Sequence, residues 1–175
     1  MDLVFPSIEN KQAVLEYIQE HTDHGETKIH GSNGLDHAES YDKWLEKVIW
    51  NQAESSPDWV PNSTYFAVVD GRLVGMTNIR HHLNEFLLNT WGHIGYGVRP
   101  SERRKGYATQ ILSLALIECR AFAIDKALVS CDKDNIASAK TILKNGGVLE
   151  KEINQADGSI LQQYWIPVVS GPAVA

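Results

Sequence analysis

The stretch from Gly92 to Thr109 most constrains what this chain can fold into. Residues 93–98 have the apolar content of a short buried strand, and Pro100 ends it. Three basic residues at 103–105 follow, and Gly106 leads directly into a long segment with helical apolar periodicity. The first backbone N–H groups of a helix lack intrahelical partners, and the helix dipole adds partial positive charge there. A strand, a basic turn and a helix start together predict an anion-binding site.

The charge of this turn is opposite to that of the whole chain. Residues 99–105 carry four cations and one carboxylate, a net charge of +3, whereas the 175-residue chain has a net charge of −6. Local positive charge in an acidic protein favours an anionic ligand such as a phosphate over a merely solvated surface turn. Two familiar phosphate motifs are excluded: the P-loop spacing is absent, and one glycine stands where a dinucleotide fingerprint needs three.

The composition is that of an ordinary globular protein. Hydrophobic residues make up 43 % and charged residues 22 %, which excludes the disordered and membrane-spanning classes. Cys119 and Cys131 have no metal-type spacing, so we expect a reduced, cytoplasmic protein without a metal site. The first residues show no signal peptide, and the acidic balance argues against nucleic-acid binding.

The periodicities predict one mixed α/β domain over residues 1–167, followed by a tail at 168–175. Helices are expected at about 9–22, 41–50, 106–124 and 135–145, with a short one within 80–89, and strands at 63–69, 72–79, 92–98, 127–131, 148–153 and 160–166. Asp70 and Gly71 predict a hairpin turn between the first two of these strands. The strand–helix–strand order of 92–131 predicts a crossover between two parallel strands.

The second predicted helix has the clearest apolar face. Its apolar positions recur at i, i+3, i+4, i+7 and i+8: Tyr41, Trp44, Leu45, Val48 and Ile49. An aromatic and aliphatic stripe at this spacing is typical of a buried helix face, so we expect it in the core.

The basic turn resembles the acyl-CoA pyrophosphate loop of the GNAT family of N-acetyltransferases. In that family the loop reads Gln/Arg-x-x-Gly-x-Gly/Ala after a strand ending in Val-x-Pro. Here residues 103–108 read Arg-Arg-Lys-Gly-Tyr-Ala, after Val98 and Pro100. Order, spacing and flanking strand agree, and the resemblance covers 60–167. It implies the GNAT fold: an antiparallel meander plus one parallel crossover, with the strands on either side of the loop splayed apart.

Three further segments resemble a branch of predicted acetyltransferases within that family. They are Arg-His-x-Leu-Asn at 80–84, Gly-His-Ile-Gly-Tyr at 92–96 and Tyr-Trp-Ile at 164–166. The branch pattern names no acceptor, so the sequence leaves the amine substrate open.

The resemblance implies acetyl-CoA as co-substrate, without a metal. Backbone N–H groups at 104–109 would bind its pyrophosphate, and a glycine lets the phosphate approach without a Cβ in the way. The loop residues in this role are Arg103, Arg104, Lys105, Gly106, Tyr107, Ala108 and Thr109. Tyr96 and Val98 would pair their main chain with the pantetheine arm. Asn135 and Ser138 match the family's Asn-x-x-Ala/Ser, although Asn135 also suits a helix N-cap.

The catalytic residues are less clearly indicated. The family often has a tyrosine seven residues after the asparagine to protonate the CoA thiolate, and here that position is Ile142. Ser138 and Tyr164 are the remaining candidates for this proton. An alkylamine must lose a proton before it attacks, and His93, then Glu85, are the predicted bases.

The sequence therefore predicts an N-acetyltransferase that moves an acetyl group from acetyl-CoA to an amine by direct attack in a ternary complex. The acceptor is a small molecule or a peptide, with no nucleic-acid or membrane partner, and a homodimer is compatible with the family. Two alternatives stay open. One is a non-catalytic acyl-CoA sensor or interaction module of the same fold, and the other is a nucleotide-phosphate binder that uses the same basic turn.

Overall fold

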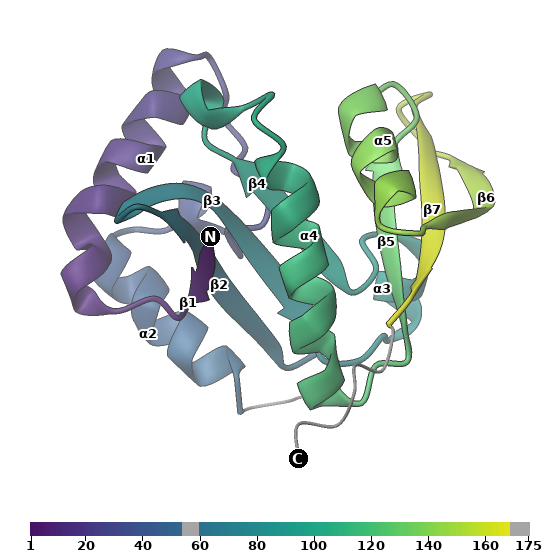
Figure 1. Ribbon diagram of the computed structural model, residues 1–175, viewed down its shortest axis with the longest axis horizontal. Coiled ribbons are helices and arrows are strands. Elements are labelled where there is room, and N and C mark those ends of the chain that lie inside the picture. Colours follow the sequence, from purple (N-terminus) through teal and green to yellow (C-terminus); the bar gives the residue numbers. More distant parts are fainter. Residues whose placement is uncertain (54–59, 169–175) are drawn as a thin grey trace.

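The computed structural model describes residues 1–53 and 60–168, and it contains two antiparallel sheets (Figure 1). The first sheet has the order β1-β2-β3-β4, formed by Asp2–Val4, Asn62–Val69, Arg72–Arg80 and Ile94–Val98. The second has the order β5-β7-β6, formed by Lys126–Asp132, Ile160–Pro167 and Val148–Asn154. The predicted tail lies outside the described residues except for Val168.

Helices cover both faces of the first sheet. The helices are α1 (Lys11–Asp23), α2 (Tyr41–Asn51), α3 (Glu85–Asn89), α4 (Tyr107–Glu118) and α5 (Ile136–Lys144), with 3-10 turns at Ile8–Asn10, Leu35–His37, Pro100–Glu102 and Cys119–Phe122. Helices α1 and α2 pack on one face, against a core that includes Phe66 and Met76. Helix α4 packs on the other face and also meets the second sheet, so one core joins the two sheets (Figure 1). No helix in the described part of the chain is long and apolar enough to cross a membrane.

Most of the predicted elements are confirmed, and α2 shows where one residue differs. Its N-terminus is capped by the Ser40 side chain, which accepts the Lys43 N–H. Trp44 is buried and stacks on Phe66 with ring centroids 5.8 Å apart. The placement of Ile49 in the core was wrong, because its side chain is 54 % exposed. The buried stripe is narrower than the periodicity suggested, because only one sheet face covers the helix.

The mixed α/β fold class is confirmed, but β4 and β5 do not form a parallel ladder. Within the described residues their backbones meet at one isolated antiparallel bridge, Gly92 with Val129. The His93 N–H donates to the Leu128 carbonyl at 2.7 Å, and the Leu128 N–H donates to His93 Nδ1 at 2.9 Å. The His93 ring thus accepts the Leu128 N–H in place of a backbone carbonyl, and beyond this point β4 and β5 do not pair. This leaves an opening between the sheets.

The contact between the sheets depends on the absence of a side chain at Gly92. Its φ is +66°, and a Cβ there would lie 2.3 Å from the Leu128 carbonyl oxygen. A backbone atom cannot move out of the way without breaking the His93–Leu128 bonds. Glycine is therefore required both by the conformation and by the close approach.

We expect Gly92→Ala to lower the free energy of unfolding by about 3 kcal/mol, because left-handed strain and overpacking act together. Gly71→Ala is the matched control: its φ is +77°, but a Cβ there would meet no atom within 4 Å, so about 1 kcal/mol is expected. Urea unfolding of both variants measures the difference. Equal losses would show that the approach to Leu128 is not the reason for glycine.

Candidate functional site

The turn between β4 and α4 has the backbone shape of an anion-binding concavity. Arg104 and Gly106 both have left-handed conformations, with φ of +64° and +82°. Gly106 immediately precedes α4, and a Cβ there would meet no atom within 4 Å. Successive N–H groups that turn through such conformations at a helix N-terminus bind anions. The turn therefore has the backbone geometry that an anion-binding site needs, with open space at Gly106, and phosphate binding there stays a prediction.

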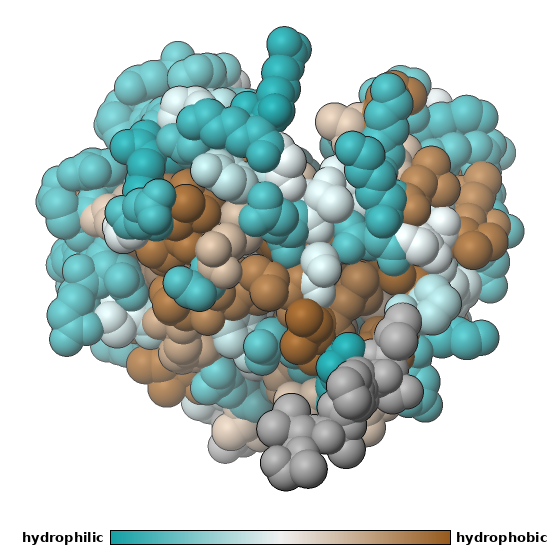
Figure 2. All heavy atoms as spheres, in the orientation of Figure 1, coloured by the Kyte–Doolittle hydropathy of each residue, from teal (hydrophilic) through white to brown (hydrophobic). Residues whose placement is uncertain are grey.

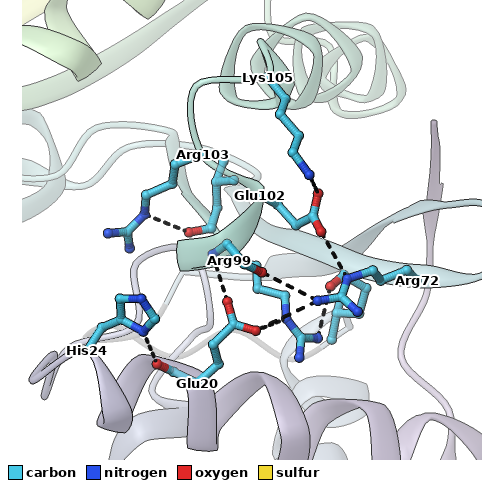
Figure 3. Close-up of polar contacts among 10 residues, drawn as sticks. Glu20, His24, Arg72, Arg99, Glu102, Arg103 and Lys105 are labelled. Atoms are coloured by element: carbon cyan, nitrogen blue, oxygen red, sulfur yellow. Dashed lines mark hydrogen bonds and ion pairs between the residues drawn. The ribbon is translucent and has the colours of Figure 1, made fainter.

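The side chains of the basic run are largely engaged with carboxylates. Arg103 forms a two-pronged ion pair with Glu26, with N–O distances of 2.5 and 2.7 Å. Lys105 Nζ lies 2.7 Å from a Glu102 oxygen (Figure 3). The net charge of the turn counted along the sequence is therefore reduced in the fold by residues of α1 and the loop after it. Direct contacts of Arg103 and Lys105 with a phosphate stay predictions, because each would have to exchange its present partner.

A second ion-pair network fixes the turn to α1. Arg99 is only 7 % exposed, and its Nε lies 2.5 Å from a Glu20 oxygen. The other Glu20 oxygen accepts the Ser101 N–H at 2.7 Å. Arg72 reaches Glu102 at 3.0 Å, which links β3 to the same turn (Figure 3). The start of α4 is thus held by contacts from α1 and β3.

These contacts lower the pKa of both glutamates that face the turn. Desolvation alone would raise the pKa of Glu20, but hydrogen bonds from Ser101 and Arg99 outweigh it and lower the pKa to about 2. The hydrogen bond from Arg103 outweighs burial, which would raise the pKa of Glu26, and with a smaller contribution from His21 it lowers this pKa to about 2. Both carboxylates are therefore ionised at neutral pH and hold the guanidinium groups in place.

A tyrosine hydroxyl joins β4 to α5. Tyr96 OH lies 2.8 Å from Ser138 Oγ, and Ser138 in turn donates its N–H to Asn135 Oδ1 at 3.0 Å. Burial raises the pKa of Tyr96 to about 12, so this hydroxyl is protonated at neutral pH. Figure 2 shows the surface hollowed between the part that carries α1 and β4 and the part that carries α5.

The sequence indicated only main-chain contacts for Tyr96 and so missed its side chain. Strand alternation was the available signal, since Ile94, Tyr96 and Val98 share the face toward α4. Ile142, at the family's tyrosine position, is 0 % exposed and lies in the core. The Tyr96 hydroxyl reaches α5 from the neighbouring strand instead.

His93 has a structural position. It is buried, and its Nδ1 lone pair accepts the Leu128 N–H, so the neutral ring carries its proton on Nε2. Burial, together with the positive charge of Arg80, lowers the pKa of His93 to about 4. A ring with its lone pair occupied and a low pKa is a weak proton acceptor, and a role as base stays a prediction.

The remaining catalytic candidates lie apart. Tyr164 is 4 % exposed and donates its hydroxyl to Gln162 Oε1 at 2.6 Å on its own strand. Glu85 is exposed in the first turn of α3. Within residues 1–53 and 60–168, no hydrogen bond joins any two of the four predicted catalytic residues, and no three His, Cys, Asp or Glu side chains could hold a metal ion.

Further predicted cofactor residues lie on either side of the turn, at the end of β4 and in the first turn of α4. The Val98 carbonyl accepts from Arg103 Nε at 3.2 Å, and the Thr109 carbonyl accepts from the Asn145 amide at 3.2 Å. Tyr107, Ala108 and Thr109 are half-buried in the first turn of α4. All of these lie at the α4 end of β4, so the structure brings the predicted loop residues together in one place.

A strand that leaves its neighbour, followed by a phosphate-type turn and a helix start, is the arrangement that the resemblance to the GNAT family implies. The family model of the acetyltransferase (GNAT) domain matches residues 5–148, and the chain belongs to the GNAT family. Comparison of the sequence with curated proteins found no match.

Solved GNAT structures share this fold at low sequence identity. One is the ribosomal L7/L12 α-N-protein acetyltransferase RimL in complex with coenzyme A, at 15 % identity and a TM-score of 0.69, covering 94 % of this chain and 92 % of that one. The microcin C7 self-immunity acetyltransferase MccE, in complex with acetyl-CoA and AMP, is 19 % identical with a TM-score of 0.69, covering 94 % and 91 %. The spermidine N-acetyltransferase SpeG of Vibrio cholerae is 12 % identical with a TM-score of 0.67, covering 96 % and 95 %.

We expect Glu20→Gln to lower the free energy of unfolding by about 2 kcal/mol at pH 7, because Arg99 then loses its buried counter-charge. The pKa of Glu20 is lower in the folded state, about 2, than its ordinary value of 4.5. The stability from the ionised carboxylate is therefore complete above pH 4.5 and is lost as the pH falls toward 2. The difference between wild type and variant should shrink over this window.

Urea unfolding as a function of pH measures this difference. The control is Glu16→Gln, which should change stability by less than about 0.5 kcal/mol. Glu16 is an exposed carboxylate on the same helix, and within the described residues it accepts a hydrogen bond only from Gln12. If the difference in unfolding free energy between wild type and Glu20→Gln stayed constant from about pH 5 to about pH 2.5, it would contradict the lowered pKa of Glu20.

Proposed function

We propose that this protein transfers the acetyl group of acetyl-CoA to an amine acceptor. The observation that carries the proposal is the backbone concavity at Arg104 and Gly106, which lies at the α4 N-terminus beside the unpaired edge of β4. A pyrophosphate fits an open helix start, and a pantetheine arm fits an unpaired strand edge. The neighbouring GNAT structures with bound coenzyme A or acetyl-CoA support this use of the fold.

The loop would bind the cofactor mainly through its backbone. The N–H groups at 104–109 supply uncharged donors and the dipole of α4, and Arg104 supplies a side chain that has no ion pair within the described residues. Arg103 and Lys105 would contribute by exchanging Glu26 and Glu102 for phosphate oxygens. Asn135 and Ser138 lie across the opening, where the pantetheine arm would pass.

The bound thioester supplies an activated acetyl group and a thiolate leaving group. The corresponding thiol has an ordinary pKa of about 8.5. In this proposal the Tyr96 hydroxyl, with Ser138 beside it, donates its proton to the departing thiolate, and the tyrosinate takes up the proton that the nitrogen of the attacking amine loses as the amide forms. Tyr96 replaces the family tyrosine for which Ile142 is present here. Ser138 from the sequence prediction keeps a role as the partner that orients this hydroxyl.

The attacking amine must be neutral, so its ammonium form first loses a proton. Glu85 is the predicted base that solvent reaches, on the segment between β3 and β4. We retain Glu85 for this step, because the lone pair of His93 already accepts the Leu128 N–H. His93 instead holds the two sheets together at the end of the opening.

A non-catalytic acyl-CoA sensor is the second candidate, and the buried Ile142 at the family's tyrosine position favours it. Such a module would bind acetyl-CoA without thiol release toward any amine. The two functions are therefore separated by measuring binding and thiol release in parallel.

We expect Gly106→Asp to weaken acetyl-CoA binding at least tenfold relative to Gly106→Asn, on the order expected for a unit charge near a phosphate. The two side chains have the same shape and both tolerate the left-handed φ of +82°, so the comparison isolates the negative charge. Titration calorimetry with acetyl-CoA measures both affinities. Equal affinities of the two variants would show that the pyrophosphate does not bind at this turn. Tight binding of ATP without binding of acetyl-CoA would show that the protein is a nucleotide-phosphate binder and does not use acetyl-CoA.

We expect Tyr96→Phe to lower kcat by about 100-fold at neutral pH, because the thiolate then leaves without its proton donor. The loss should diminish above pH ~8.5, where a free thiolate is stable. Tyr164→Phe is the control, since its hydroxyl bonds only Gln162 within the described residues, and its kcat should stay near that of the wild type. Thiol release with the best amine of a screening panel is the measurement. A larger effect of Tyr164→Phe would return the proton donor to that residue.

A further inference from the structure

Arg80 is a half-buried cation at the end of β3. Its backbone N–H donates to the His93 carbonyl at 2.8 Å, which continues the pairing of β3 with the chain before β4. Its guanidinium lies 5.6 Å from the centre of the Trp91 ring, and Nη1 makes a long hydrogen bond of 3.4 Å to the Gly92 carbonyl. Burial lowers the pKa of Arg80 to about 10, still far above neutral pH, so the side chain is charged.

Arg80 differs from Arg72, Arg99 and Arg103 in its lack of a counter-charge, and it differs from Arg104, which also has no ion pair within the described residues, in being half-buried and not exposed. Arg72, Arg99 and Arg103 each lie within ion-pair distance of a glutamate. No carboxylate within residues 1–53 and 60–168 forms an ion pair with Arg80. A cation that is largely withdrawn from water is costly without an anion, and one carbonyl contact and a ring face satisfy few of its five N–H donors. The guanidinium is therefore free to bind an incoming anion.

The guanidinium lies over β4, at the end opposite the phosphate turn. A Cβ built on Gly95 would lie 3.8 Å from Arg80 Nη1 and 3.8 Å from the Cα of Gly31. Gly31 belongs to the loop between α1 and α2, and a Cβ on it would lie 2.8 Å from the Cα of Tyr96. Val98 lies three positions after Gly95, a span of roughly 10 Å along the strand. Arg80 thus lies beside the first half of β4, away from the pyrophosphate turn, on the sheet face toward the loop between α1 and α2, whereas the Tyr96 side chain lies on the α4 face.

The polar groups beside Arg80 on this face carry no charge. Asn78 follows the same alternation as Arg80, and its amide donates to Asn62 Oδ1 at 2.8 Å and to Thr64 Oγ1 at 3.0 Å. The Asn33 amide donates to the same Asn62 oxygen at 2.9 Å. These buried amides satisfy one another and offer Arg80 no anion. The groups that these hydrogen bonds join therefore supply no counter-charge to Arg80.

We propose that Arg80 binds a carboxylate group of the amine acceptor, so that the acceptor is an amino acid or another amine that carries a carboxylate. This inference rests on the proposed acetyl transfer, and it names the substrate class for that reaction. A guanidinium binds a carboxylate through two parallel hydrogen bonds, which would orient the acceptor as well as attract it. A polyamine, which is a multiple cation, would be repelled by the same group.

The first test uses the wild-type protein and matched acceptors. Each common L-amino acid is paired with its own carboxamide, which keeps the amine and side chain but removes the negative charge, and spermidine represents the polyamines. With acetyl-CoA present, thiol release should show a kcat/KM at least tenfold higher for the preferred amino acid than for its carboxamide, and little release with spermidine. Equal kcat/KM values for acid and amide, or spermidine as the best acceptor, would overturn the proposal.

The second test changes the arginine. Arg80→Gln should abolish the preference for acid over amide, and Arg80→Lys should retain part of it, whereas acetyl-CoA affinity stays within twofold in both. Arg120→Gln, which removes the same charge from an exposed position in the 3-10 turn after α4, should keep the full preference. Thermal unfolding identifies any variant that fails to fold, and the wild-type comparison then decides alone. A full preference in a folded Arg80→Gln variant would contradict the assignment.

The outcomes separate this inference from the proposed function. Acetyl-CoA binding together with thiol release toward amines that lack a carboxylate would leave the acetyltransferase assignment intact and overturn the role of Arg80. Acetyl-CoA binding without thiol release toward any amine would support the sensor and overturn both proposals.

Discussion

The buried ion pair between Arg99 and Glu20 is the contact on which the geometry of the cofactor turn depends. Glu20 accepts both the Arg99 guanidinium and the Ser101 N–H, so one carboxylate ties α1 to the backbone that follows β4. A buried charge pair contributes little net stability by itself, but the loss of one partner leaves the other charge uncompensated. The pair therefore acts chiefly to allow one arrangement of the turn, and with it the direction of the α4 N-terminus.

The same network changes how the proposed site would attract an anion. A count of charges along the turn suggests that cationic side chains provide the attraction, but Glu26 and Glu102 occupy Arg103 and Lys105 in the fold. The backbone N–H groups and the dipole of α4 then carry most of the field, with Arg104 beside them. Arg80 is the contrasting case, because its neighbour Asn78 on β3 is an uncharged amide that bonds Asn62 and Thr64 of β2. Most cations at the turn are thus paired with carboxylates, whereas Arg80 has no ion pair within the described residues.

Local patterns predicted most of the elements and the loop, and they failed where two distant segments meet. The hairpin at Asp70–Gly71 and the start of α4 at Gly106 follow from short-range turn and helix-start preferences. The gap between β4 and β5 depends on the His93 side chain replacing a carbonyl partner of Leu128, and the reach of Tyr96 to Ser138 depends on that gap. Neither contact leaves a periodic signal, because each joins residues at least 35 positions apart.

The sequence by itself determined the family, the order of helices and strands, and the position of the phosphate turn, because these depend on residues that are neighbours in the chain. Only the tertiary structure decided which charged side chains near the turn have an ion-pair partner. Glu20 and Glu26 lie about 80 positions before their partners, and folding alone brings them to Arg99 and Arg103. It also decided that Arg80 lacks a carboxylate partner within the described residues, because the electrostatics of a site are set by distance in space and by exclusion of water.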